Sequence, residues 1–203
     1  MSAVIPGRAE GAGPESSVLA WIPGSRAADA PRNDDERELH YITPMTDTVR
    51  IQREPFDLAA ETAKLTHGRT DVGAVVTFTG ICRGDEHGEP IAALTLEHYP
   101  GMAEAEIERH VAEARERWPL ADVTVIHRHG RIVPGEDIMM VATTSSHRQA
   151  AFAAAEFLMD YLKTRAPFWK QVEKASGATW VDAKATDDAA AERWSARGRH
   201  AAE

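Results

Sequence analysis

The most constraining feature of the sequence is a long apolar helical pattern that ends in a basic and aromatic segment. Its apolar positions share one helix face and are Ala151, Ala155, Leu158, Met159 and Leu162. Pro167 ends the pattern, because proline pushes the residue before it out of the α region. The chain must therefore bury one long amphipathic helix against another layer, and 203 residues suffice for one such core.

Shorter strand and helix patterns alternate through the rest of the chain. The expected strands are Val49–Arg53, Val72–Gly80, Ile91–His98, Val123–His129, Asp137–Ala142 and a short late one at Trp180–Ala183. The other expected helices run from an Asp57 cap to Leu65 and from Glu104 to Trp118. We expect Val72–Gly80 to be buried and residues 83–90 to form a polar loop. This order predicts a mixed α+β fold, one domain over residues 46–203.

The first 45 residues have a different character. They are rich in Ala, Gly, Pro and charged residues and show no sustained periodicity. This composition predicts a disordered extension over residues 1–45. Met45 opens a segment typical of a domain start, so translation from Met45 is an alternative to translation from Met1.

Composition limits the function classes. The formal net charge of -9 argues against broad nucleic-acid binding. Cys82 is the one cysteine in the sequence, which excludes an internal disulfide and a cysteine-based zinc site. No apolar run approaches a membrane span, and the N-terminus lacks the apolar stretch of a secretory signal. We therefore expect a cytoplasmic protein that binds neither membrane nor nucleic acid.

The helix end at Tyr161–Lys170 carries Lys163, Arg165 and Lys170 in this acidic chain. Such a local positive site indicates an anionic ligand bound at one place. A lysine among other cations in a partly dry pocket can act as an acid, a base or a nucleophile. Cations also complement the dipole at a helix C-terminus, so these residues alone leave catalysis and simple capping open. Phe168 and Trp169 are expected to anchor the turn in the core.

The start of the same helix is a second candidate anion site. Ser146 and Gln149 fit a capping box, which would place His147 and Arg148 in the first turn. Free backbone N–H groups there favour a phosphate or carboxylate. These four residues alone fit a solvated basic turn better, because such short motifs recur by chance.

Three further residue sets have weaker signals. Arg83 follows a strand end beside a Gly-rich loop, where side chains reach ligands, although an exposed loop arginine is the simpler interpretation. His127 and His129 share a strand face, but no third ligand has a recognisable spacing, so no metal site is expected. Cys82 is expected to be a small buried residue, and the acidic residues of the 83–90 loop to be solvated.

Six segments together resemble the large, catalytic subunit of molybdopterin synthase. They are Gly73–Gly80, Leu94–Met102, Arg117–Leu120, Val125–Arg128, Ser146–Arg148 and Asp160–Lys170. The resemblance runs in order from about Val49 to Trp194 and excludes the first 45 residues. It implies an α/β-hammerhead fold and a heterotetramer, in which two large subunits form a central homodimer.

The same resemblance implies the reaction. A small ubiquitin-like subunit docks on each large subunit and threads its C-terminal Gly-Gly thiocarboxylate into the pocket. Two sulfurs then pass to cyclic pyranopterin monophosphate and form the dithiolene of molybdopterin. No metal, nucleotide or other cofactor is implied for this step.

The resemblance also implies site residues, which are assigned by their positions in the matching motifs. Lys163 and Lys170 match the two pocket lysines, of which Lys163 is the one more directly implicated in catalysis. The matched substrate-binding residues are Arg83, His147, Arg148 and Lys184, with His147 and Arg148 supplied across the dimer. Lys184 stands where some relatives have arginine, which keeps the charge but loses the bidentate geometry. The loop after Arg83 also departs from the Asn-rich pattern of relatives.

Two other function classes remain as alternatives. A lysine Schiff-base enzyme could use Lys163 on a carbonyl substrate. A non-catalytic adaptor could keep the dimer and the small-subunit groove, although it would have no need of both lysines. An α-helix rises about 1.5 Å per residue, so Arg148 and Lys163 would lie roughly 22 Å apart. The two residues cannot both line one small site within a subunit, which favours a site shared between two copies of the chain.

Overall fold

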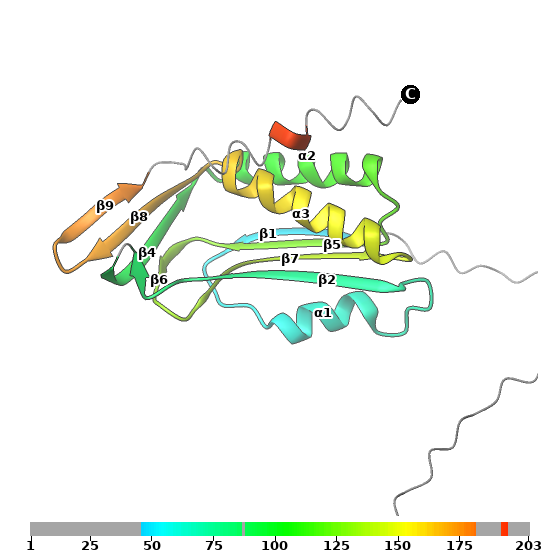
Figure 1. Ribbon diagram of the computed structural model, residues 1–203, viewed down its shortest axis with the longest axis horizontal. Helices are drawn as coiled ribbons and strands as arrows, with labels where there is room; N and C mark the ends of the chain where they lie inside the picture. The colour runs from blue at the N-terminus through cyan, green and yellow to red at the C-terminus, as the bar shows by residue number, and fades with distance from the viewer. Residues whose placement is uncertain (1–45, 87, 182–191, 195–203) are drawn as a thin grey trace, which may run out of the picture. The chain divides into compact units, whose positions relative to one another are not determined.

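The computed structural model describes residues 46–86, 88–181 and 192–194 (Figure 1). The strands are β1 (Asp47–Gln52), β2 (Ala74–Ile81), β3 (Asp85–Glu86), β4 (Glu89–His98), β5 (Val123–Arg128), β6 (Gly130–Ile132), β7 (Asp137–Ser145), β8 (Phe168–Lys174) and β9 (Gly177–Val181). The helices are α1 (Leu58–Thr66), α2 (Met102–Arg117) and α3 (Arg148–Thr164). The α+β class expected from the sequence is confirmed. The expected extension, residues 1–45, lies outside the described residues.

A four-stranded sheet in the order β1-β5-β7-β2 carries the main core. β1 runs parallel to β5, whereas β5 pairs with β7 and β7 with β2 in the antiparallel sense. Helices α2 and α3 cover one face of this sheet and α1 covers the other (Figure 1). Every residue of β5 is buried as a result, because both of its faces are covered.

Helix α3 has the core face that the sequence predicts. Its buried residues are Ala150, Ala151, Ala154, Ala155, Phe157, Leu158, Met159 and Leu162. All of these except Ala151 and Ala155 share one core cluster with Val123, Val125 and Val141 of the sheet and with Ile107 and Val111 of α2. The helix ends at Thr164, and the Arg165 backbone N–H donates to the Tyr161 carbonyl at 2.7 Å. The turn across Pro167 then sends the chain directly into β8.

A second, antiparallel sheet lies at one end of the first (Figure 1). Its order is β3-β4-β8-β9, and β6 also pairs with β4. A separate core cluster packs Cys82, which follows β2, with Leu94, Leu96, Ile132 and Val172 of this sheet. The register places Leu96 opposite Lys170, so the second sheet carries one of the candidate lysines.

One local expectation about strands needs correction. The Val72–Gly80 strand is present as β2, but it is not fully buried, because it forms an edge of the first sheet. Phe78 and Ile81 are consequently exposed. The stretch between the strands β5 and β7 contains the short strand β6.

The predicted capping box at Ser146 and Gln149 is wrong. The N-cap residue of α3 is His147, and its backbone N–H donates to the Ser145 hydroxyl at 3.2 Å. Strand β7 continues through Ser145, which moves the helix start one residue beyond the expected cap. The Asp57 cap of α1 is confirmed, since its carboxylate accepts the Ala60 N–H at 3.0 Å.

The expectation that both Phe168 and Trp169 anchor in the core is also wrong. Successive residues of a strand point to opposite faces, so only one of the two can face inward. Phe168 faces inward and stacks on His127, whereas Trp169 is exposed and packs edge-on against Tyr99. No helix in the described part of the chain has the length and apolar content needed to cross a membrane.

Candidate functional site

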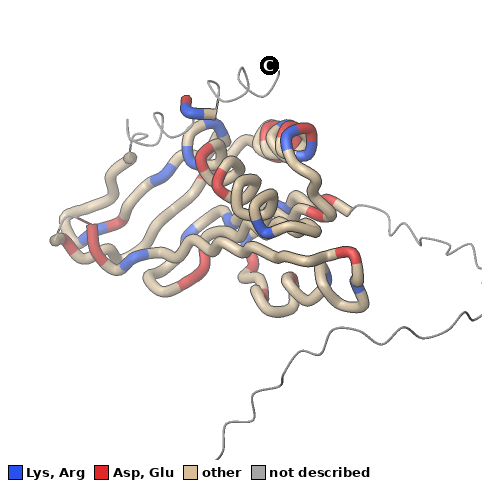
Figure 2. Tube along the Cα trace, turned by 45° about the vertical axis from the view of Figure 1, so that its right-hand side comes forward, with Lys and Arg blue, Asp and Glu red and all other residues tan. Residues whose placement is uncertain are grey.

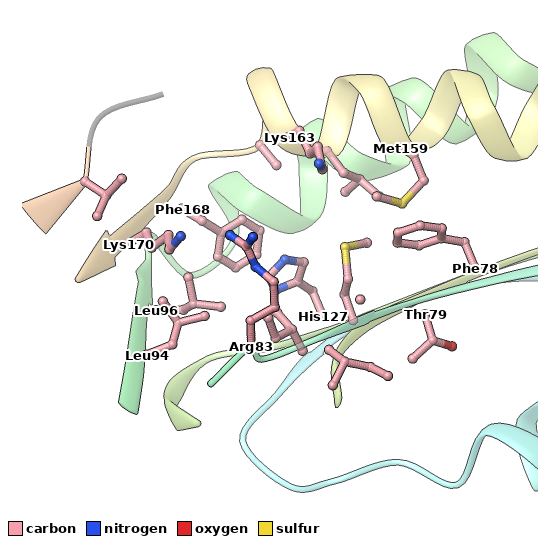
Figure 3. Close-up of a pocket in the computed structure, with 17 residues that line it drawn as sticks. Phe78, Thr79, Arg83, Leu94, Leu96, His127, Met159, Lys163, Phe168 and Lys170 are labelled. Atoms are coloured by element: carbon pink, nitrogen blue, oxygen red, sulfur yellow. The ribbon is translucent and has the colours of Figure 1, made fainter. Parts of the chain in front are cut away.

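A pocket of about 720 Å³ lies between α3, the end of β2 and the second sheet. Its apolar walls include Leu94, Leu96, Met139, Met159 and Leu162. Three cations, Arg83, Lys163 and Lys170, also line it. Figure 3 shows the nitrogen-bearing ends of these three side chains directed into the same space. Apolar surroundings strengthen the attraction of these cations for an anion, because less water screens them.

Different elements bring the three cations together. Lys163 lies in the last turn of α3, Lys170 is the third residue of β8, and Arg83 follows β2. Phe168 and Lys170 lie two residues apart on β8 and so share the face that lines the pocket. The Pro167 turn therefore sets both lysines around one cavity, a proximity that helical spacing could not predict.

His127 forms part of the pocket wall, a position that its sequence pattern did not reveal. Burial lowers the pKa of its imidazole to about 4, so the ring is neutral at pH 7. Its Nδ1–H donates to the Arg128 carbonyl at 2.8 Å, which leaves Nε2 as the unprotonated nitrogen. His129 packs against His98 with ring centroids 4.6 Å apart. Within the described ranges no three metal-ligating side chains are grouped as a metal ion would require.

Glu86 corrects the expectation of a solvated acidic loop. It belongs to β3, is buried, and its Oε1 lies 3.6 Å from Lys170 Nζ. No periodic pattern indicates this burial, because it depends on a two-residue strand that pairs with β4. The pocket cations thus have a carboxylate of the same chain beside them.

Cys82 is buried, as the sequence predicts. Burial raises the pKa of its thiol above the usual value, which disfavours the reactive thiolate. Nearby Lys170 acts in the opposite direction with a smaller effect. The geometry therefore supports a packing role for Cys82 rather than a nucleophilic one.

The candidate residues at the other end of α3 do not join this pocket. His147 and Arg148 are exposed at the start of the helix, and neither lines the cavity. Lys184 lies outside the described residues. Of the six candidates, the structure brings together Arg83, Lys163 and Lys170.

The comparisons with known proteins decide the family. The sequence model of the family described as MoaE protein matches residues 51–165, which is more than half of the chain. The chain belongs to the MoaE protein family. Arg83 and Lys163 lie inside the matched range, and Lys170 lies five residues beyond it.

Individual MoaE relatives are similar over nearly their whole length. A curated protein from Mesorhizobium japonicum, named molybdopterin synthase catalytic subunit, is 66% identical over 72% of this chain and 92% of its own. One of the same name from Rhizobium meliloti is 60% identical over 74% of this chain and 97% of its own. A solved MoaE structure from Burkholderia ambifaria matches with a TM-score of 0.64 and 50% identity, covering 74% of this chain and 99% of that one.

Proposed function

We propose that this chain is the catalytic subunit of a molybdopterin synthase. It transfers two sulfurs, one from each of two thiocarboxylated Gly-Gly C-termini of small ubiquitin-like subunits, to cyclic pyranopterin monophosphate. The observation that carries the proposal is the convergence of Arg83, Lys163 and Lys170 on one apolar-walled pocket. Relatives at 60% identity and above bear the name of this enzyme subunit.

The chemistry of the two ligands suits such a pocket. The pterin carries a phosphate and the donor tail ends in an anionic thiocarboxylate, so both bind best to Arg forks and Lys point charges. Arg83 and Lys170 orient these anions. Lys163 handles protons, or the covalent intermediate, as sulfur attacks the pterin side chain. Proton transfer and anion binding are the demands of this step, and the side chains of the pocket can meet both.

The second anion site comes from another copy of the chain. Arg148 and Lys163 stand at opposite ends of α3, and fifteen helical steps of 1.5 Å separate them by roughly 22 Å. That span exceeds a small substrate, so one subunit cannot bring both residues to it. In a homodimer, His147 and Arg148 of one copy hold the phosphate beside the lysines of the other.

Reconstitution tests the proposal directly. The chain is mixed with a thiocarboxylated Gly-Gly partner and the pyranopterin precursor, and molybdopterin formation is measured. Lys163→Ala is expected to abolish transfer while dimerisation and partner binding persist. Lys64→Ala is the matched control, because Lys64 is an exposed lysine on α1 that pairs with Glu61. Full activity in Lys163→Ala would overturn the assignment of Lys163, and partner binding without any transfer by the unaltered chain would favour an adaptor.

A further inference from the structure

The carboxylate of Glu86 is an unusual neighbour for an anion-binding pocket. Its side chain is only 9% exposed, and its Oε1 lies 3.6 Å from Nζ of Lys170, which is 35% exposed. Lys170 lines the pocket, whereas Glu86 is not among the residues that line it. A buried carboxylate is stable when a cation compensates it, so the two groups stabilise one another in the ligand-free pocket.

Backbone and side-chain contacts fix the position of Glu86. Strand β3 pairs with the start of β4, and the chain reverses through Gly88, whose φ of 83° favours glycine. Asp85 accepts the Gly88 N–H at 3.0 Å. Glu89, on the same hairpin, accepts a hydrogen bond from Lys174 Nζ at 2.7 Å. Two ion pairs therefore join this hairpin to β8, and Figure 2 shows acidic and basic positions next to one another on the second sheet.

The charge of Glu86 opposes the binding of anions. An anion that contacts Lys170 must approach a negative charge, because the Glu86 Oε1 lies 3.6 Å from Nζ of that lysine. At such separations two charges interact appreciably even when water partly screens them. The same carboxylate restricts the flexible lysine side chain to one region of the pocket.

We propose that Glu86 is a specificity and positioning residue that acts through Lys170. Its carboxylate compensates the positive charge of the Lys170 ammonium in the ligand-free pocket, which lowers the affinity of the pocket for small free anions. It also holds the Lys170 Nζ where the reaction needs it. A ligand that also engages Arg83 and Lys163 overcomes this opposition, whereas a small free anion does not. The positioning part of this inference rests on the proposed function, but the effect on anion affinity does not.

Binding of inorganic phosphate to the full chain tests the specificity part without any sulfur transfer. Calorimetry compares the unaltered chain with Glu86→Gln, which removes the charge and keeps the shape. The dissociation constant for phosphate is expected to fall about tenfold. Glu89→Gln is the matched control, since it makes the same change in net charge on the same hairpin but affects Lys174, which does not line the pocket. Its dissociation constant should stay within about twofold of the original, because an exposed charge is screened.

Four outcomes decide the inference. Equal phosphate affinity in the unaltered chain and in Glu86→Gln overturns it, as does an equal gain in Glu89→Gln. A weaker phosphate affinity of Glu86→Gln together with a lower melting temperature would assign Glu86 a purely structural role, and this result also overturns the inference. A higher phosphate affinity in Glu86→Gln alone, with Glu86→Asp retaining the affinity of the unaltered chain, supports the inference.

Kinetics in the reconstituted system test the positioning part. Glu86→Gln is expected to lower kcat about tenfold and to lower KM for the anionic donor, since Lys170 binds anions better but is held less well. Unchanged kcat overturns the positioning role. An inactive unaltered chain would count against the proposed function alone, because the phosphate measurement would still report on Glu86.

Discussion

The Phe168 ring stacks on the His127 imidazole with the ring centroids 3.9 Å apart and the planes 20° from parallel. This contact joins β8 of the second sheet to β5 of the first. Phe168 directly follows the Pro167 turn, and Lys170 lies on the same face of β8 two residues later. The buried histidine therefore supports the strand that carries one of the pocket lysines.

His127 makes the stability of the fold dependent on pH. Its pKa is lowered to about 4 in the folded chain by burial, against an ordinary value of 6.5. The stability that depends on neutral His127 is therefore fully present above about pH 6.5 and is lost progressively as the pH falls towards 4. Over this range His127 takes up its proton in the unfolded chain before it does so in the folded chain, which favours unfolding. We expect the free energy of unfolding to fall by about 2 kcal/mol between pH 7 and pH 5 from this group, measured by urea denaturation.

His127→Asn isolates this contribution, since asparagine keeps a donor near the position of Nδ1 but does not titrate. The variant is less stable at pH 7 because it loses the stacking on Phe168. Its unfolding free energy should nevertheless change less between pH 7 and pH 5 than that of the unaltered chain. An identical pH dependence in both proteins would show that His127 is not the titrating group.

Arginine substitutions separate the roles of the two pocket lysines. Arginine keeps the positive charge but does not release its proton in proteins. Lys163→Arg should therefore lose sulfur transfer by about a hundredfold or more, the usual contribution of a general acid or base. Lys170→Arg, which only has to orient an anion, should retain activity within about tenfold. Initial rates in the reconstituted assay measure both, and the reverse order of activities would exchange the two assignments.

Local signals in the sequence predicted most of the fold. The spacing of apolar residues identified α3, and the Asp57 side chain identified the start of α1, because both depend on residues within one or two turns. The β-branched Val72–Gly80 segment predicted a strand correctly but not its edge position. Whether a strand lies at the edge or in the centre of a sheet depends on the strand order, which no local sequence pattern encodes.

The candidate site was predictable only in part for the same reason. Lys163 and Lys170 were identified by their motif, but their shared cavity depends on the turn between them and on the pairing of β8 with β4. His127 and Glu86 were missed as members of the site. Their positions follow from contacts with residues far away in the sequence, namely Phe168 for His127 and Lys170 for Glu86.

Asp160 anchors the described C-terminal residues to α3. Its Oδ2 accepts hydrogen bonds from Arg193 Nη2 and from Trp194 Nε1, both at 2.6 Å. Trp194 is buried in the main core. Asp160→Ala should lower the free energy of unfolding by about 2 kcal/mol, because it removes charge-assisted hydrogen bonds at a partly buried site.

Glu156→Ala is the control for Asp160, since Glu156 pairs with the same Arg193 from a more exposed position. Exposed ion pairs contribute about 0–1 kcal/mol, so this variant should be the more stable of the two. Chemical denaturation of both variants gives the comparison. Equal losses would mean that the Trp194 hydrogen bond contributes nothing.

Mixed dimers test whether the pocket and the start of α3 act across two copies of the chain. Lys163→Ala and Arg148→Ala subunits, each inactive alone, are unfolded together in equal amounts and refolded. In a two-fold dimer whose site combines Lys163 of one copy with Arg148 of the other, half of the dimers are mixed and each mixed dimer regains one intact site. Activity should then return to about a quarter of that of the unaltered protein. A site built within one subunit would regain none, because every subunit carries one of the two substitutions.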